Sequence, residues 1–183
     1  MMLGYWQQPE ATQNTINSQG WLHTGDIAEI RDGYLFIRGR IKEIIVTSTG
    51  EKASPVDIEM AITLDPLFEQ AIVVGEAKPF LGALLVLNQK QWQKYASKLD
   101  LIDTENSSLQ NPKLHRIVLQ KLKKILQPFP SYAQIHAVFL TLEPWTIDNG
   151  LLTPTMKPKR NEFQQRFAEH ITALYSGHNV PEV

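Results

Sequence analysis

The chain has 183 residues, of which 43% are hydrophobic and 20% are charged, the usual composition of a globular protein. A formal net charge of −1 excludes a general nucleic-acid binder, which would be strongly basic. Because the sequence holds no cysteine, disulfides, thiol catalysis and cysteine-bound zinc are excluded, and no apolar run approaches the length that crosses a bilayer.

The first part of the chain, residues 1–40, is predicted to form short strands and turns. The runs "WLHTGDIAEI" and "YLFIRGR" are rich in strand-forming residues and flank Asp32-Gly33, which is a hairpin signal. "MLGYW" is a strand-like apolar run, and the segment lacks the basic start and apolar middle of a signal peptide. Residues 41–53 add an apolar strand that ends in a polar loop.

From Ser54 onward, helices and strands alternate. The helix starts are marked by N-cap residues, in two cases followed by proline, and lie at Ser54-Pro55, Asn88 and Asn111-Pro112. Three buried strands, "QAIVVGE", "GALLVLN" and "IHAVFLTL", separate the helices, and "LIDTENSSLQ" is predicted to be a plain polar loop. A last helix carries apolar residues at helical spacing, namely Phe163, Phe167, Ile171 and Leu174. The pattern predicts an α+β domain with a three-stranded sheet and packed helices.

Two charged residues near the ends of the first strands are candidates for nucleotide binding. Asp26 follows Thr24-Gly25, and a carboxylate with two acceptor oxygens can take both hydroxyls of a ribose. Arg40 follows Gly39, and a guanidinium fork suits phosphate or ribose oxygens. Taken alone, Asp26 is better explained as a cap of its own turn, and Arg40 as a solvated surface arginine.

The stretch "LLTPTMKPKR", residues 151–160, holds a lysine between two prolines. It follows the turn signal Asn149-Gly150, and neither Pro154 nor Pro158 can donate a backbone hydrogen bond. We therefore predict a stiff loop that holds Lys157 in a narrow range of positions.

Taken in order, these stretches resemble a known family. "GWLHTGDIAEI", "GRIKEIIVTSTGEKASPVDIE" and "TPTMKPKR" resemble the last three signature regions of the AMP-forming acyl-CoA synthetases, and "GYWQQPEAT" is similar to the end of the signature before them. "LHTGDI" and "LLTPT" are similar to the wording of the long-chain fatty acid–CoA ligase branch. Several linked motifs in the right order are far more specific than any one of them.

The resemblance implies that the chain is a C-terminal fragment, predicted to be inactive alone. The whole enzyme would activate a fatty acid with ATP to acyl-AMP and then form acyl-CoA. Residues 1–41 would be the remnant of a large N-terminal domain, and residues 42–183 the mobile small domain. ATP or AMP, Mg²⁺ and CoA are the implied cofactors, none of them bound tightly by this fragment. The implied partners are the fatty acid and the missing N-terminal domain, whose phosphate loop, adenine pocket and acyl pocket lie upstream.

Roles are carried over residue by residue from the resemblance. Asp26 matches the acid that binds the ribose hydroxyls, and Arg40 matches the arginine beside the ribose or phosphates. Lys42 matches the hinge about which the small domain rotates. Lys157 matches the lysine that lies between the fatty carboxylate and the α-phosphate during adenylation. The loop that lines the pantetheine passage during thioester formation matches Ser48, Thr49, Gly50 and Glu51.

The chain departs from the family pattern at two places. Most relatives have two glycines or a similar pair after the serine, whereas here Thr49-Gly50 follows, and a β-branched residue is poorly suited to positive φ. Many relatives have glycine before the lysine, where this chain has Met156, which is expected to add apolar packing. Arg160 matches a recurring arginine to which no role is given.

Two alternative functions stay open. The Thr49 departure leaves room for an acyl-AMP ligase that loads the phosphopantetheine of a carrier protein. The other alternative is a non-catalytic interaction module derived from such a domain, although a binding module has no need of Asp26, Arg40 and Lys157 together.

The remaining charged and metal-binding residue types receive the simpler interpretation. No metal site is predicted, because the histidines show no paired metal spacing; they are His23, His115, His136, His170 and His178. The helix "KLHRIVLQKLKK" is expected to present a solvated basic face, with a membrane or CoA-phosphate contact as the alternative. The implied location is the cytoplasm, with peripheral membrane contact left open.

Overall fold

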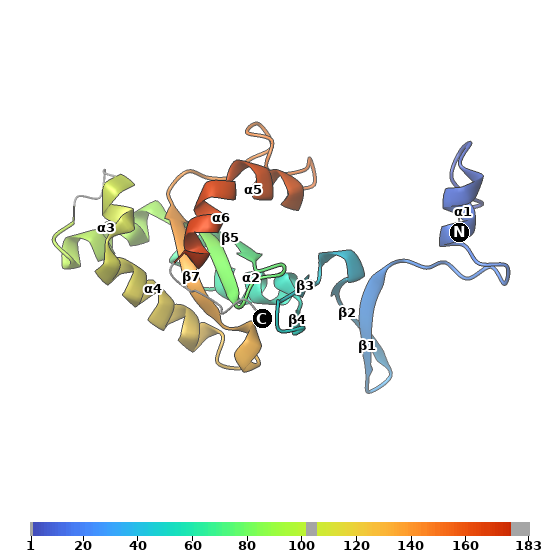
Figure 1. Cartoon of the computed structure of the whole chain (residues 1–183), viewed down its shortest axis with the longest axis horizontal. Coiled ribbons are helices and arrows are strands. Elements are labelled where there is room, and N and C mark those ends of the chain that lie inside the picture. Colours follow the sequence, from blue (N-terminus) through green and yellow to red (C-terminus); the bar gives the residue numbers. More distant parts are fainter. Residues whose placement is uncertain (1, 102–105, 177–183) are drawn as a thin grey trace. The chain divides into compact units, whose positions relative to one another are not determined.

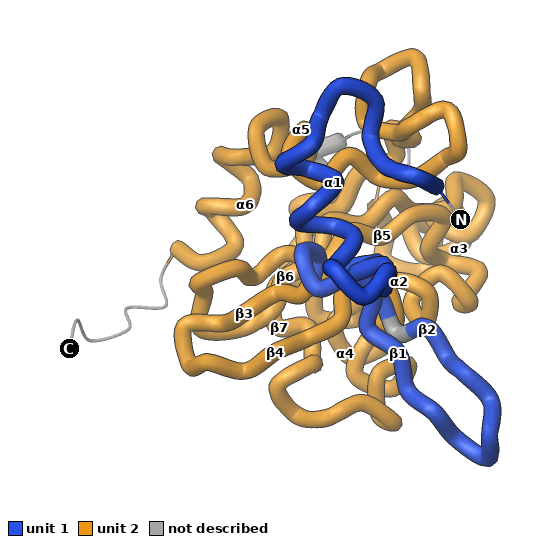
Figure 2. The backbone as a smooth tube through the Cα atoms, turned by 90° about the vertical axis from the view of Figure 1, so that its right-hand side faces the viewer, with its two compact units in different colours: residues 1–43 blue, residues 44–183 orange. Residues whose placement is uncertain are grey.

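The computed structural model describes residues 2–101 and 106–176. The chain forms two compact units, Met1–Glu43 and Ile44–Val183 (Figure 2). The break between them comes after Glu43, close to the predicted boundary between residues 41 and 42. Helices and small sheets occur together, so the predicted α+β class is confirmed.

The described part of the first unit consists of a helix and a hairpin. Helix α1 spans Pro9–Thr15, and β1 (Asp26–Arg31) pairs antiparallel with β2 (Tyr34–Arg40). Asp32 and Gly33 have φ values of 52° and 81°, as a type I′ hairpin turn requires, so the predicted turn is confirmed. The strand expected at "MLGYW" does not form, because the segment leads into α1 and pairs with no strand.

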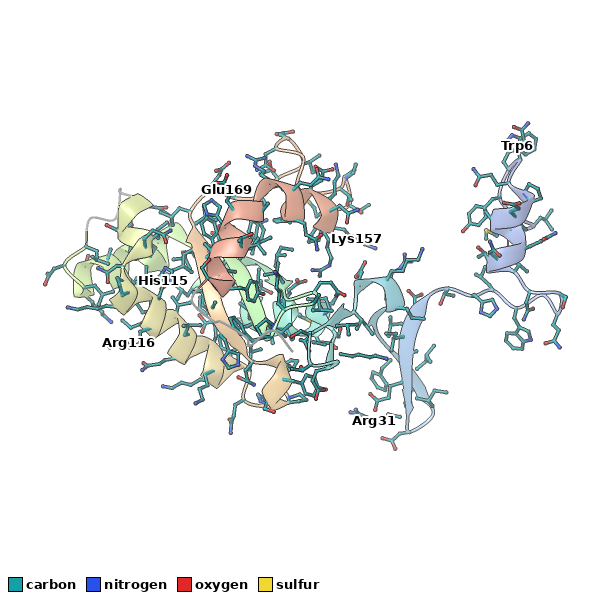
Figure 3. The ribbon with its side chains drawn as sticks, viewed as in Figure 1. Trp6, Arg31, His115, Arg116, Lys157 and Glu169 are labelled. Atoms are coloured by element: carbon teal, nitrogen blue, oxygen red, sulfur yellow. The ribbon has the colours of Figure 1, made fainter. Side chains whose placement is uncertain are left out.

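The first unit has no buried core among its described side chains. Large apolar side chains are instead open to solvent, among them Leu3, Trp6, Trp21, Ile30 and Tyr34 (Figure 3 labels Trp6). A two-stranded hairpin without a core is marginally stable by itself. Exposed apolar surface of this extent is typical of a face that another protein surface covers.

The second unit is built on the predicted three-stranded sheet, and the structure gives its strand order as β5-β6-β7. β5 (Phe68–Val74) and β6 (Leu81–Leu87) form an antiparallel hairpin, and β7 (Ile135–Thr141) lies parallel to β6. A parallel connection needs a long crossover. Here it is made by η2 (Asn106–Gln110) and by the predicted helices α3 (Gln89–Lys98) and α4 (Pro112–Ile125).

Helices cover both faces of this sheet (Figure 1). Side chains of α2 (Pro55–Thr63), α3 and α4 pack in one core with Leu81, Ala83 and Leu85 of β6. Leu84 and Val86 point into a second core with α5 (Arg160–Arg166), which α6 (Ala168–Tyr175) flanks. Because β6 is buried on both faces, its sequence is a continuous apolar run rather than an alternating one.

Short elements connect these layers. They are η1 (Ile41–Glu43), β3 (Ile45–Val46), β4 (Lys52–Ala53) and η3 (Ser131–Ala133). Two of the three predicted caps are confirmed, since Asn88 Oδ1 accepts the Gln91 N–H at 3.0 Å and Asn111 Oδ1 accepts the Lys113 N–H at 2.8 Å. Ser54 stands at the N-cap position of α2, but its side chain makes no cap hydrogen bond.

Two expectations about the second unit are wrong. The last helix is divided at Phe167 into α5 and α6, although Phe167 N–H still bonds Phe163 O at 3.0 Å, so the break is a local bend that apolar spacing does not reveal. The "LIDTENSSLQ" segment is not a plain loop: residues 106–110 form η2, and Leu109 is buried under α4 and β7. Residues 102–105 of that segment lie outside the described part.

Candidate functional site

Lys157 closes a tight hairpin loop, residues 153–157, that precedes α5 (Figure 3). The N–H of Thr153 donates to Lys157 O at 2.8 Å, and the N–H of Lys157 donates to Thr153 Oγ1 at 3.0 Å. Met156 N–H donates to Thr153 O at 2.8 Å, and Pro154 takes the second position of this turn, where its fixed φ fits. The backbone of Lys157 is therefore held on both sides while its side chain stays exposed.

The base of this hairpin is anchored in the second core. Leu151 and Leu152 are 2% and 4% exposed. Lys159 N–H donates to Leu151 O at 2.9 Å, and Leu152 forms an antiparallel bridge with Pro158. These contacts support the stiff loop predicted from the two prolines, and its stiffness itself stays a prediction.

Met156 occupies a strained backbone position. Its φ is 61°, in the left-handed region that favours glycine. Its side chain is 61% exposed, so the apolar packing expected of it is wrong. The position after a turn of this kind needs positive φ whatever residue stands there, so a glycine would fit it with less strain.

The residues predicted to line a pantetheine passage form a second hairpin loop, residues 47–51. Thr47 N–H donates to Glu51 O at 3.0 Å, and Gly50 N–H donates to Thr47 O at 2.9 Å. Gly50 alone of these residues has positive φ, 83°. Thr49 uses its hydroxyl to bond the Thr47 hydroxyl at 2.8 Å, and Ser48 N–H donates to Lys78 O at 2.9 Å. In this structure only the glycine position needs positive φ, so Thr49 is compatible with the loop as it stands here.

Asp26 and Arg40 are brought together across the β1–β2 hairpin. They are directly opposed in the strand register, and Arg40 Nε donates to Asp26 Oδ1 at 3.2 Å. The side chains are 28% and 63% exposed, so the pair is open to a ligand. Thr24 Oγ1 accepts the Asp26 N–H at 3.1 Å and so supplies an acceptor within this turn.

Lys42 is the middle residue of η1, at the end of the first unit. Its side chain is exposed. The preceding residue, Ile41, is fixed by an N–H donated to Gly25 O at 2.8 Å.

Arg160, whose role the sequence leaves open, forms an ion pair with a residue that sequence reasoning missed. Its Nη2 donates to both carboxylate oxygens of Glu59 on α2, at 2.8 and 3.0 Å. Glu59 and Arg160 are 101 positions apart, so no local pattern could have linked them.

Comparisons with known proteins decide the family. Residues 42–179 match the model of the AMP-binding enzyme C-terminal domain. The chain therefore belongs to the family of AMP-binding enzyme C-terminal domains.

Relatives of this AMP-binding enzyme domain include ligases for long-chain fatty acids. It is 34% identical to the long-chain-fatty-acid–[acyl-carrier-protein] ligase AEE15 of Arabidopsis thaliana, over 96% of this chain and 24% of that protein. It is 35% identical to the long-chain-fatty-acid–CoA ligase FadD15 of Mycobacterium tuberculosis, over 94% of this chain and 29% of that protein. The chain thus spans about a quarter of the length of these relatives.

A solved structure is similar throughout. The carboxylic acid reductase A-PCP didomain from Segniliparus rugosus, in complex with AMP, matches with a TM-score of 0.80 and 25% identity. The match covers 96% of this chain and 23% of that one.

No predicted site residue of this AMP-binding enzyme domain lines its large surface groove. The groove, of about 810 Å³, lies along α4 and is lined by His115, Arg116, Leu119 and Ile135 among others (Figure 3 labels His115 and Arg116). Lys157 and the 47–51 loop lie on exposed hairpins instead. Such residues can act on a substrate only if another surface brings the substrate to them.

The predicted basic face of α4 is largely as expected. Lys113, Arg116, Lys123 and Lys124 are exposed. Lys121 instead donates to Asp65, with its Nζ 2.9 Å from Oδ2, and this hydrogen bond raises the pKa of Lys121. No helix in the described part of the chain is long and apolar enough to span a bilayer.

His115, His136 and His170 make side-chain contacts with neighbouring residues. His115 Nε2 lies 2.8 Å from Leu109 O, and the His170 ring stacks on Phe139 at 4.1 Å. Among residues 2–101 and 106–176 no three His, Asp or Glu side chains group closely enough to hold a metal ion. His178 lies outside those ranges.

Proposed function

We propose that this chain is the C-terminal part of a longer enzyme that activates a fatty acid with ATP to acyl-AMP and then forms acyl-CoA. The observation that carries the proposal is the hairpin 153–157, which fixes the backbone of Lys157 and leaves its ammonium exposed. The names of the relatives, ligases of long-chain fatty acids, support the same reaction class.

Adenylation brings two anions together. A carboxylate oxygen of the fatty acid attacks the α-phosphorus of ATP, the bond to the bridging oxygen breaks, and pyrophosphate leaves with the electron pair. The ammonium of Lys157 offsets the repulsion between the anions and stabilises the charge that develops on the phosphate. Because the hairpin already holds the lysine backbone, only the side-chain torsions of Lys157 have to be ordered when the group is placed.

Asp26 and Arg40 are proposed to bind the nucleotide. The ribose hydroxyls would donate to the Asp26 carboxylate, and Arg40 would turn toward ribose or phosphate oxygens. An exposed ion pair contributes only about 0–1 kcal/mol, so opening it costs little. The described residues contain no group of acids that fits Mg²⁺, and we assign no residue of this chain to that ion.

The second step transfers the acyl group. The CoA sulfur attacks the carbonyl carbon of acyl-AMP, and AMP leaves with the electron pair of the broken bond. The hairpin that contains Ser48, Thr49, Gly50 and Glu51 would line the pantetheine passage.

Residues 42–183 would rotate about Lys42 between the two steps, since hinges are residues at the ends of elements that absorb changes in φ and ψ. The uncovered apolar side chains of residues 2–43 support the assignment of residues 1–41 to a larger N-terminal domain.

A carrier protein is the second candidate acceptor. It is favoured by the 34% identity to a ligase whose name specifies acyl-carrier protein. Offering the full-length enzyme either free CoA or a carrier that bears phosphopantetheine separates the two. The chain keeps the Asp26–Arg40 pair and also Lys157, and a non-catalytic interaction module would have no need of all three residues. A cytoplasmic location and a peripheral membrane contact remain predictions.

The decisive experiment measures the two half-reactions of the full-length enzyme separately. Lys157→Ala is expected to lower pyrophosphate exchange by about 10²–10³-fold, as loss of one charge-stabilising group does. Conversion of supplied acyl-AMP to acyl-CoA should change little, because the lysine acts only in the first step. Lys159→Ala is the matched control, an exposed lysine in the same stretch. Equal losses in both half-reactions would mean that Lys157 has only a structural role.

A further inference from the structure

A largely buried ion pair joins α5 to α2 just after the Lys157 hairpin. Arg160, the first residue of α5, donates from Nη2 to Glu59 Oε2 at 2.8 Å and to Oε1 at 3.0 Å. The two side chains are only 25% and 12% exposed. A pair so shielded from water holds its geometry more firmly than the open Asp26–Arg40 pair.

The sheet fixes the other side of this pair. Glu59 Oε1 accepts the N–H of Val73 at 2.8 Å, and Arg160 Nη1 reaches Val73 O at 3.5 Å. Val73 is a buried residue of β5. Helix α2, strand β5 and helix α5 therefore meet at one carboxylate and one guanidinium.

The link from Arg160 back to Lys157 is short and stiff. Pro158 has a ring-fixed φ. Lys159 donates its N–H to Leu151 O at 2.9 Å, and its carbonyl accepts the N–H groups of Glu162 at 2.9 Å and Phe163 at 3.2 Å. A displacement of Arg160 must therefore be transmitted to the limb of the hairpin that carries Lys157.

We propose that Arg160 and Glu59 are positioning residues for adenylation, which set where the Lys157 ammonium lies. The inference rests on the proposed role of Lys157. Glu59 compensates the charge of Arg160, whereas Lys157 forms no ion pair within the described residues, so the lysine charge is the one available to a substrate. The pair itself touches neither ATP nor fatty acid in this scheme.

The proposal predicts a specific kinetic pattern. A misplacement of a catalytic group by about 1 Å can cost 10²-fold in rate. Arg160→Lys keeps the charge but loses the planar fork, and Glu59→Gln keeps an acceptor for Val73 N–H but loses the charge. Either change should lower kcat of pyrophosphate exchange by about 10–100-fold. KM for ATP and the conversion of supplied acyl-AMP should stay near normal.

The test uses the full-length enzyme with Arg166→Lys as control. Arg166 lies on the same helix but is more exposed, with its Nη1 3.0 Å from Asn149 O and its Nη2 3.6 Å from Glu143 Oε1. A thermal unfolding scan shows whether each variant is folded. If Arg160→Lys does not fold, the same kinetic pattern is measured in Glu59→Gln.

A double-mutant cycle separates positioning from general stability. In the Lys157→Ala background, Arg160→Lys should lower adenylation no further, because its effect passes through the missing ammonium. Additive losses, or equal losses in both half-reactions, would overturn the proposal. If Lys157→Ala alone leaves adenylation intact, the proposed function of Lys157 fails, and this outcome is distinguished without any Arg160 variant.

Discussion

The hairpin loops 47–51 and 153–157, "TSTGE" and "TPTMK", share one backbone frame and end in opposite charges. In each, the first threonine N–H donates to the carbonyl of the last residue, at 3.0 Å in one and 2.8 Å in the other. The hydroxyl of that threonine accepts the N–H of the last residue, at 3.2 and 3.0 Å. It also bonds the hydroxyl of the second threonine, at 2.8 and 3.0 Å. The threonines therefore set the frame, and the last residue, Glu51 or Lys157, sets the charge it presents.

The two loops differ in how they are anchored. The 47–51 loop is held from the β5–β6 turn, where Ser48 N–H donates to Lys78 O at 2.9 Å and Val46 N–H donates to Glu76 Oε2 at 3.0 Å. The 153–157 loop is held from α5, through Arg160 and its Glu59 partner. Because the anchoring residues differ, the position of each loop can change without changing the other. Two loops that serve different steps of the reaction would need this independence.

Locking the proposed hinge should have the largest effect of the changes considered for the two loops. It would keep the 47–51 loop from its proposed role in thioester formation and leave the 153–157 loop in place for adenylation. Lys42→Pro in the full-length enzyme fixes φ near −65°. We expect pyrophosphate exchange to survive while thioester formation falls by about 10²-fold or more, since the locked state is proposed to be the adenylating one. Lys42→Ala is the control and should leave both steps near normal. Near-normal rates for both half-reactions in the proline variant would remove Lys42 as the hinge.

Gly50 and Met156 are the residues of positive φ in the two loops. Exchanging glycine and methionine at these positions tests whether both loops impose the same backbone strain on a residue other than glycine. A Cβ added at Gly50 meets no atom within 4 Å, so the cost of Gly50→Met is conformational, about 1 kcal/mol of the free energy of unfolding. Met156→Gly should raise that free energy by up to about 1 kcal/mol. Urea unfolding of the 183-residue chain measures both. Shifts of the same sign in the two variants would contradict the common frame.

The smallest expected effect concerns pH and the anchor of the 47–51 loop. Burial raises the pKa of Tyr175 to about 12, and the Lys78 ammonium lies over its ring at 5.4 Å. An unfolded tyrosine ionises near pH 10. Between about pH 10 and pH 12 the unfolded state therefore loses the proton first, so this contribution to stability is full below pH 10 and falls as pH rises.

Tyr175→Phe should flatten the pH dependence of the free energy of unfolding between about pH 10 and pH 12. The variant also loses the hydrogen bond from Tyr175 Oη to Val74 O, at 3.2 Å, so the slope and not the absolute stability is the readout. Identical slopes for the two proteins would show that Tyr175 ionises as it does in the unfolded chain.

The sequence by itself determined the features that depend on local physics. The Asp32-Gly33 turn, the caps at Asn88 and Asn111 and the three apolar strands follow from side-chain chemistry and periodicity within a few residues. The order of the stretches around Asp26, Gly50 and Lys157 also sufficed to indicate the family that the comparisons show.

Only the tertiary structure decided how these residues meet. The register at Arg31 and Tyr34, if continued, would set Asp26 opposite Gly39, and the irregularity between Ile27 and Ala28 shifts it to Arg40. The partner of Arg160 lies 101 positions away, beyond the reach of any local pattern. Such pairings depend on how the sheet and helices pack as a whole, because a charge separated along the chain finds its partner only when burial brings the two elements together.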